Sequence, residues 1–138
     1  EAEFTPTNTA KMLIFHYLYK LSPKHPKLAA MRKLIELAQE ARTRLLFFVT
    51  PLDWQTGEEH HPGEFRKITA ANIALIKAIA APHGIEVLDL SCSLTTDFFA
   101  YRRFPNEHLG QQGRAFVADQ LAAWVLSGPD APKPKDKE

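Results

Sequence analysis

The run Arg44–Thr50 (RLLFFVT) decides the fold of this chain. Its five central residues are apolar without interruption, and Pro51 follows directly. A strand with one face in water alternates apolar and polar residues, whereas a strand covered on both faces reads as a continuous apolar run. We therefore expect a buried strand that ends before Pro51 and belongs to a parallel sheet.

Three helices are predicted around this strand. Apolar residues recur at helical spacing in Lys27–Ala41, Glu64–Ala81 and Gln111–Leu126. The last of these is expected to bury one stripe of side chains, formed by Phe116, Val117, Leu121, Trp124 and Val125.

The remaining segments are a second strand, one ambiguous stretch and two loops. Ile85–Leu90 is predicted to be a short strand. Ala10–Leu21 fits helical spacing, but its aromatic and β-branched residues would also suit a strand; we favour a helix. Polar loops are expected at Leu52–Gly63 and Ser91–Glu107, the second with a short helical turn near Thr96–Tyr101.

Alternating helices and apolar strands predict the α/β class, with three α/β/α layers around a narrow parallel sheet, as in flavodoxin-like folds. One domain is expected over residues 5–126, followed by a disordered tail at 127–138, where three prolines alternate with charges. Residues 1–4 resemble the scar of a yeast secretion vector. Open edges of a narrow sheet attract partners, so we expect self-association or a domain completed by a missing N-terminal half.

Composition excludes several classes of protein. The 138 residues carry a formal net charge of +1 with both signs interspersed, which gives no electrostatic reason to bind nucleic acid. Cys92 is the single cysteine, so the sequence is not a disulfide scaffold. No apolar run approaches the roughly 18–20 residues that cross a bilayer. No cofactor is expected.

His108 is the first candidate for chemistry. It lies in the loop between the second predicted strand and the last helix. Ligands of open α/β sheets bind at such loops, outside the carboxyl ends of the strands. A histidine there can act as a general base near neutral pH. The alternative is a loop histidine that caps the following helix or is simply exposed.

A family resemblance supports this candidate. Three segments follow one another in order. They are the strand that ends before Pro51, the strand Glu86–Ser91, and the block Glu107-His108-Leu109-Gly110 with Gly113-Arg114. Together they resemble the C-terminal half of an SGNH-hydrolase-like domain, with the DltD-like and alginate-acetylation-like envelope acyltransferase relatives as the closest kind. In that family the last block carries the catalytic histidine, followed by Leu and by a Gly that opens the final helix. The resemblance implies that His108 is the general base.

The sequence departs from the family pattern in two ways. The family places an aspartate three residues before the histidine to orient the imidazole, and this chain has Pro105 there. The alternatives for orienting the imidazole are Glu107, Asp97 or a backbone carbonyl. The Gly-Asp-Ser block with the family's nucleophilic serine is absent from the sequence, as are recognisable oxyanion blocks. The resemblance therefore implies a nucleophile outside these residues.

Other nucleophiles are less favoured. Ser91 and Ser93 flank Cys92 just after a strand, where nucleophiles do occur. No Gly-x-Ser-x-Gly elbow surrounds them, and small polar residues after a strand mostly form turns. Cys92 is interpreted as a small buried side chain.

Further residues suggest binding sites. Trp54 and Asp53 would suit a carbohydrate-facing rim, with Trp54 as a loop anchor as the alternative, and Arg103 would suit an anionic substrate. His60, His61 and Glu64 are residue types that bind zinc or nickel, but Pro62-Gly63 prevents a regular helical pair, and a solvated loop is the favoured interpretation.

Two functions follow from this sequence. The first is an esterase or O-acyltransferase that acts on carbohydrate or cell-envelope polymers. The second is a non-catalytic module that binds carbohydrate or protein, or assembles through its sheet edge. The resemblance and the vector-like N-terminus suggest a secreted, periplasmic or cell-envelope location.

Overall fold

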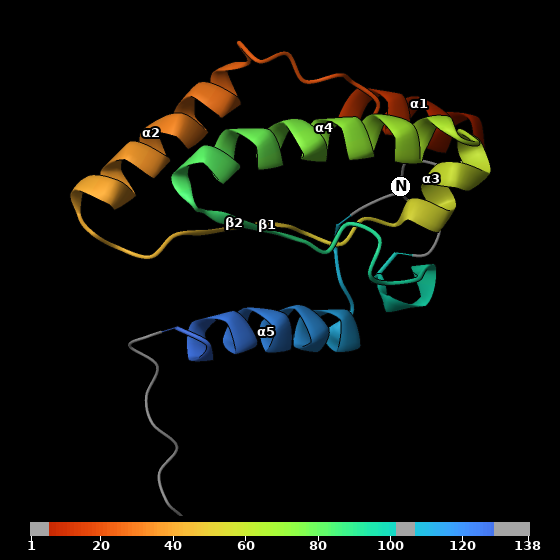
Figure 1. The fold of residues 1–138 in the computed structure, drawn as a ribbon. Helices are drawn as coiled ribbons and strands as arrows, with labels where there is room; N and C mark the ends of the chain where they lie inside the picture. The colour runs from red at the N-terminus through yellow and green to blue at the C-terminus, as the bar shows by residue number, and fades with distance from the viewer. Residues whose placement is uncertain (1–5, 102–106, 129–138) are drawn as a thin grey trace, which may run out of the picture.

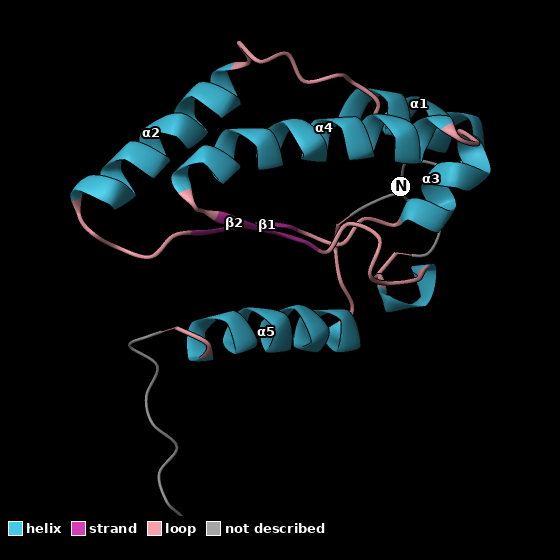
Figure 2. Cartoon of the chain, in the orientation of Figure 1, coloured by secondary structure: helices cyan, strands magenta, loops and turns pink. Residues whose placement is uncertain are grey.

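A computed structural model describes residues 6–101 and 107–128. Over these residues the chain is mixed α/β, with five α-helices and a small parallel sheet of two strands. Figure 2 shows how short the strands are beside the helices. In chain order the elements are α1 (Pro6–His16), α2 (Pro26–Glu40), β1 (Leu46–Val49), α3 (Trp54–His60), α4 (Glu64–Ala80), β2 (Glu86–Asp89) and α5 (Gln111–Leu126).

The predicted parallel pairing is confirmed. β1 and β2 run in the same direction, with Leu46 opposite Glu86 and Val49 opposite Asp89. Parallel neighbours need a crossover connection, and α3 and α4 supply it. α2 and α4 lie on one side of the strands and α5 on the other, so the loops after both strands meet at one end of the molecule (Figure 1).

The main core lies where α2 and α4 meet the sheet. Its fully buried members are Leu28, Met31, Ile35 and Ala80, and Phe47 and Val87 pack against them from the two strands. Burying one such aliphatic side chain stabilises a fold by about 1.5–3 kcal/mol. The contacts between α2, α4 and the strands therefore hold the sheet in place.

The ambiguous N-terminal segment is a helix, as favoured, but the helix lies earlier in the chain than expected. α1 begins at Pro6 and ends at His16, and the chain from there to Leu21 belongs to neither a helix nor a strand. The side chain of Asn72 on α4 binds this stretch, because it accepts from the Leu21 amide at 2.8 Å and donates to the Tyr19 carbonyl at 2.9 Å. These bonds satisfy backbone groups that a longer helix would have used internally.

The expectation of a loop over Leu52–Gly63 is wrong, because α3 forms there. Asp53 caps this helix by accepting from the Thr56 amide at 3.2 Å. Gly57 then faces the ring of Phe65 so closely that an added Cβ would lie 2.5 Å from the ring. A short helix of polar residues has little apolar periodicity, so this tertiary contact was not visible in the sequence.

The predicted buried stripe of α5 is also partly wrong. Val125 is 54% exposed, and the other expected members, Phe116, Val117, Leu121 and Trp124, are only partly buried. A sheet of two strands is too narrow to cover a helix of this length. The Arg44 guanidinium instead secures the C-terminal end of α5, because it stacks on the Trp124 ring at 4.0 Å and donates to the Trp124 carbonyl at 3.2 Å.

The predicted turn near Thr96–Tyr101 is present as a single 3-10 turn, Thr96–Phe98. Of the expected tail, the structure describes Ser127, which is the C-cap of α5, and Gly128, whose amide donates to the Val125 carbonyl at 3.4 Å. The expectations for residues 1–4 and for the rest of the tail fall on residues 1–5 and 129–138, outside the described part of the chain.

Candidate functional site

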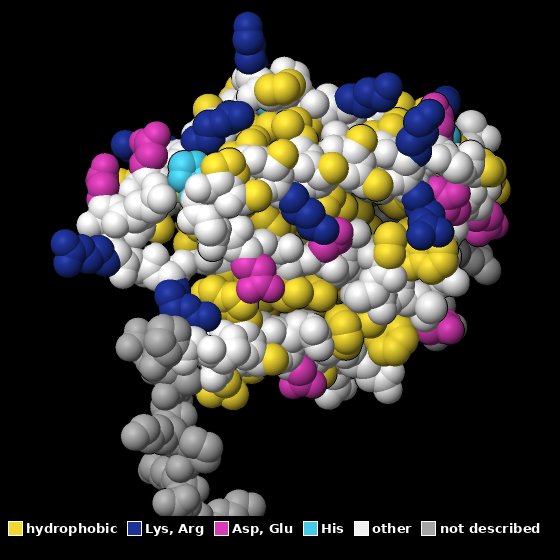
Figure 3. Space-filling view, viewed as in Figure 1, with side chains coloured by type: hydrophobic (Ala, Val, Ile, Leu, Met, Phe, Trp, Pro, Cys, Tyr) yellow, Lys and Arg dark blue, Asp and Glu magenta, His cyan; other side chains and the backbone are white. Residues whose placement is uncertain are grey.

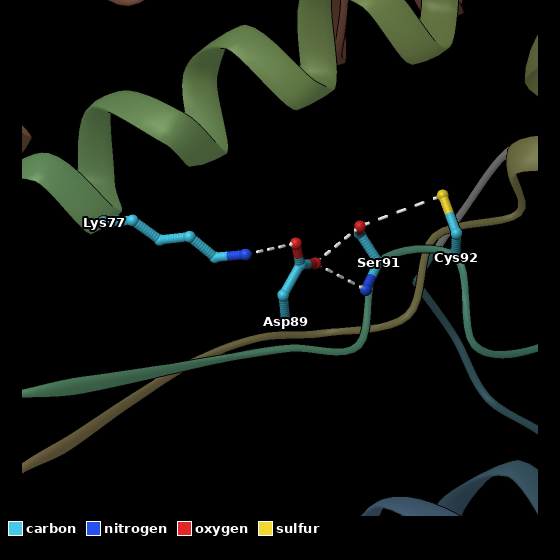
Figure 4. A network of polar contacts seen from close by, with 4 residues as sticks. All are labelled: Lys77, Asp89, Ser91 and Cys92. Atoms are coloured by element: carbon cyan, nitrogen blue, oxygen red, sulfur yellow. Dashed lines mark hydrogen bonds and ion pairs between the residues drawn. The ribbon is translucent and has the colours of Figure 1, made fainter.

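A polar network lies at the carboxyl end of β2 (Figure 4). Asp89, the last residue of the strand, accepts a hydrogen bond of 2.7 Å from the Ser91 hydroxyl and one of 3.2 Å from the Ser91 amide. Its other carboxylate oxygen lies 2.9 Å from the Lys77 ammonium of α4. The network thus joins the strand end, the turn after it and the helix above.

The network keeps Asp89 ionised. Partial burial disfavours the charged carboxylate, but the hydrogen bonds from Ser91 and Lys77 outweigh this effect and hold the pKa of Asp89 below its usual value. A carboxylate already stabilised in this way is a weak base for the Ser91 proton. Ser91 is also 7% exposed, so the geometry favours a turn-forming role for it.

The neighbours of Ser91 have separate environments. The Ser93 hydroxyl donates to the Leu90 carbonyl at 2.8 Å, as turn-forming serines do. Cys92 is exposed, which corrects the expectation of a buried side chain, and its sulfur lies 3.9 Å from the Ser91 oxygen.

His108 is exposed and is positioned through its backbone. Its carbonyl accepts from the Ala100 amide at 2.7 Å, and Leu109 next to it forms an antiparallel bridge with Phe99. Its ring meets Tyr101 edge-on with 6.0 Å between ring centroids. These backbone contacts with Phe99 and Ala100 hold His108 just before α5 begins.

The glycines that follow His108 have a structural reason. The Gly110 amide donates to the Phe98 carbonyl at 2.8 Å. A Cβ added at Gly113 would lie 2.8 Å from the same carbonyl oxygen, closer than real side chains approach. The Gly-x-x-Gly spacing thus lets the start of α5 pack directly on the turn Thr96–Phe98.

Glu107 is engaged by the N-terminal part of the chain. The Tyr17 hydroxyl donates to one oxygen of Glu107. Burial, the hydrogen bond to Glu107 and the negative charge of that carboxylate together raise the pKa of Tyr17 far above its ordinary value. Glu107 therefore connects the end of α1 to the His108 loop. Pro105, where the family has its aspartate, lies outside the described residues.

His108 and Ser91 line different cavities. His108, Tyr101, Glu107 and Arg114 line a hollow of about 420 Å³, in which Arg114 is fixed by a hydrogen bond of 2.7 Å to the Leu109 carbonyl. Ser91 lines a larger groove of about 810 Å³ beside α4. The structure therefore does not bring these two predicted catalytic residues together in one cavity.

The two residues of the predicted substrate rim make internal contacts, and those of Trp54 fit the alternative of a loop anchor. Asp53 is 2% exposed, and its carboxylate accepts from Thr56 and, at 2.7 Å, from the Thr96 hydroxyl. The Trp54 indole donates to the Leu94 carbonyl at 3.0 Å, and the Arg66 guanidinium lies 5.2 Å from its ring. Both residues tie α3 to its neighbours. Arg103 lies outside the described residues.

The weaker metal candidate gains no support. In residues 6–101 and 107–128, no three His, Cys, Asp or Glu side chains are arranged to hold a metal ion. His61 approaches the Ala10 carbonyl of α1 at 3.0 Å, and His60 ends α3 while Glu64 begins α4.

Sequence reasoning missed Tyr17, Lys77 and Arg114 as site residues. Lys77 and Asp89 are 12 residues apart and Tyr17 and Glu107 are 90 apart, so no local pattern connects them. Within the described ranges, none of the helices has the length and apolar character to cross a membrane. Comparisons with protein-family models, curated proteins and solved structures gave no match.

Proposed function

We propose that this chain is an SGNH-hydrolase-like domain and that His108 is the general base of an ester hydrolase or O-acyltransferase acting on carbohydrate or cell-envelope polymers. The observation that supports this proposal is the exposed position of His108 in the loop after the strands, directly before α5. Loops at the carboxyl ends of parallel strands are where ligands of α/β folds bind. The three-layer SGNH arrangement is part of the proposal.

In this proposal His108 removes the proton from a serine hydroxyl as that oxygen attacks the ester carbonyl. The serine belongs to a Gly-Asp-Ser block, which these residues lack. Arg114 lies in the same hollow, where its cation would favour an anionic substrate or the charge that develops on the carbonyl oxygen. Tyr101 limits the rotation of the imidazole through its edge contact.

The test compares hydrolysis of p-nitrophenyl acetate by this chain and by free imidazole at equal concentration. We expect the chain to be faster and His108→Ala to remove the excess rate, because Arg114 lies in the same hollow as His108 and would favour the charge that develops on the carbonyl oxygen. His83→Ala is the matched control, because His83 is also an exposed histidine and lies in a different part of the sequence from His108, in the turn after α4. A fluorophosphonate probe should leave the chain unlabelled. An excess rate that survives His108→Ala, or a label on Ser91, would contradict the proposal.

The second candidate function is a non-catalytic binding or assembly module. It is favoured by the state of Ser91, whose hydroxyl is bonded to a carboxylate that Lys77 already neutralises. Binding of a carbohydrate or protein ligand that is saturable and unchanged in His108→Ala would support the module and separate it from the enzyme.

A further inference from the structure

The outer edge of β2 has backbone groups that β1 does not use. The Leu90 amide donates to the Val49 carbonyl of β1 at 3.1 Å, so Leu90 faces the partner strand. Backbone groups alternate in direction along a strand, and those of Val87 and Asp89 therefore point away from β1. In the described part of the chain no further strand pairs with this edge.

A groove of about 810 Å³ lies between α4 and the end of this edge, where Asp89 and the turn after β2 line it. On the helix side the groove has a low apolar wall, formed by Ala70, Ile73 and Ala74. Its opposite side is formed by Asp89, Ser91 and Ser93. Small side chains on the helix leave room for another backbone beside β2. The groove thus has the two parts that strand addition needs, an open edge and a helix beside it.

The charge of the groove is predominantly positive. Arg66, Lys67 and Lys77 line it, against one carboxylate, Asp89, which is already paired with Lys77 at 2.9 Å. Dark-blue basic side chains lie over the position of α4 in the space-filling view, above a yellow hydrophobic band between the sheet and α5 (Figure 3). All three basic residues belong to α4, so the positive charge lies on one side of the sheet only.

The two faces of β2 contact different helices. Asp89 reaches Lys77 on α4, whereas Glu86 accepts from the Trp124 indole of α5 at 2.9 Å. Leu88 shares the face of Glu86, because side chains alternate along a strand. A strand added beside β2 would therefore meet cations on its α4 side, and on its α5 side it would meet Leu88 beside Glu86, whose carboxylate is bonded to Trp124.

We propose that the β2 edge binds an extended acidic peptide segment, which adds to the sheet as a third strand. Its acidic residues alternate with apolar ones, so that the carboxylates face Arg66, Lys67 and Lys77 while the apolar side chains face Leu88 and α5. Hydrogen bonds to Val87 and Asp89 hold its backbone. This function is independent of His108.

The first test measures fluorescence polarisation of a short labelled peptide in which glutamate and valine alternate. We expect saturable binding that Lys67→Glu weakens by about tenfold at low salt, because the substitution places like charges together. Lys24→Glu, an equal charge change in the turn before α2, and His108→Ala should leave binding unchanged. A peptide of the same composition with its glutamates and valines in separate blocks should bind at least tenfold more weakly.

The second test distinguishes strand addition from simple charge attraction. In an added strand the amides of alternate residues face β2, so N-methylation of all valines and N-methylation of all glutamates should have different effects. We expect one methylated peptide to lose binding and the other to retain it. The proposal is overturned if the two methylated peptides bind equally well or if the block peptide binds as tightly as the alternating one. It is also overturned if a single-stranded oligonucleotide competes as well as the alternating peptide.

Discussion

Asp89 joins three parts of the molecule through one carboxylate. It ends β2, fixes the turn through Ser91 and anchors α4 through Lys77. Its lowered pKa means that folding favours its charged form. The resulting stabilisation is present above the pKa of the unfolded carboxyl, about 3.9, and is lost as the pH falls through the lower pKa of the folded state.

Asp89→Asn should lower the free energy of unfolding at pH 7 by less than about 1 kcal/mol, because solvent screens this partly exposed ion pair. Urea unfolding of the variant and the parent should converge as the pH falls through the lowered pKa of Asp89 in the folded state, because Asp89 is then protonated in both states. Glu36→Gln, which breaks the exposed pair with Lys33, is the control and should have a smaller effect at pH 7. A difference that persists unchanged at low pH would show that the carboxylate charge is not the cause.

At the scale of elements, α3 depends on its N-cap residue, Asp53. The helix has only 7 residues, too few to be stable alone, and Asp53 both caps it and accepts from the Thr96 hydroxyl of the loop after β2. The helix in turn carries Gly57, which packs against Phe65 of α4. Loss of the cap should therefore loosen the contact between α3 and α4.

We predict that Asp53→Ala lowers the free energy of unfolding by about 1–2 kcal/mol. Asp53→Asn keeps one acceptor oxygen and should cost less. Urea unfolding monitored by circular dichroism measures both, and hydrogen exchange should locate the change in Trp54–His60. If Asp53→Ala matches the parent, the cap does not stabilise the fold.

At the scale of the whole molecule, the fold leaves much apolar surface exposed. Phe15 is 78% exposed, and the other large apolar side chains of this kind include Ile14, Leu34, Leu37 and Phe48. Phe48 lies on β1, which pairs on one side only among the described residues. Open strand edges with apolar flanks favour association.

We therefore predict that the chain self-associates through the β1 edge. Sedimentation velocity should show a mass above 15.6 kDa that rises with concentration. Phe48→Glu should shift the distribution toward the monomer, because a charge at the edge opposes pairing, whereas Lys24→Glu should not. A single monomer across the concentration range would falsify this prediction.

The sequence by itself determined the class of the fold. The continuous run at Arg44–Thr50 and the apolar stripes of α2 and α4 predicted a parallel strand between helices, because apolar runs and helical periodicity are local patterns. The expected burial of this strand on both faces is wrong, since Phe48 is 45% exposed and the rest of β1 is only partly buried. It also predicted the order of the two strands and of α2, α4 and α5, and a loop that carries His108, but it missed α3. These properties depend on residues close together in the chain.

The tertiary structure alone decided how the candidate site is assembled. Contacts between residues far apart in the chain turned Asp53 from a predicted substrate residue into a buried cap, tied Glu107 to Tyr17, and placed Ser91 and His108 in different cavities. The open β2 edge and its row of cations arise in the same way, from the packing of α4 beside the strand. Such contacts have no sequence period, because they are fixed by how the elements pack in space.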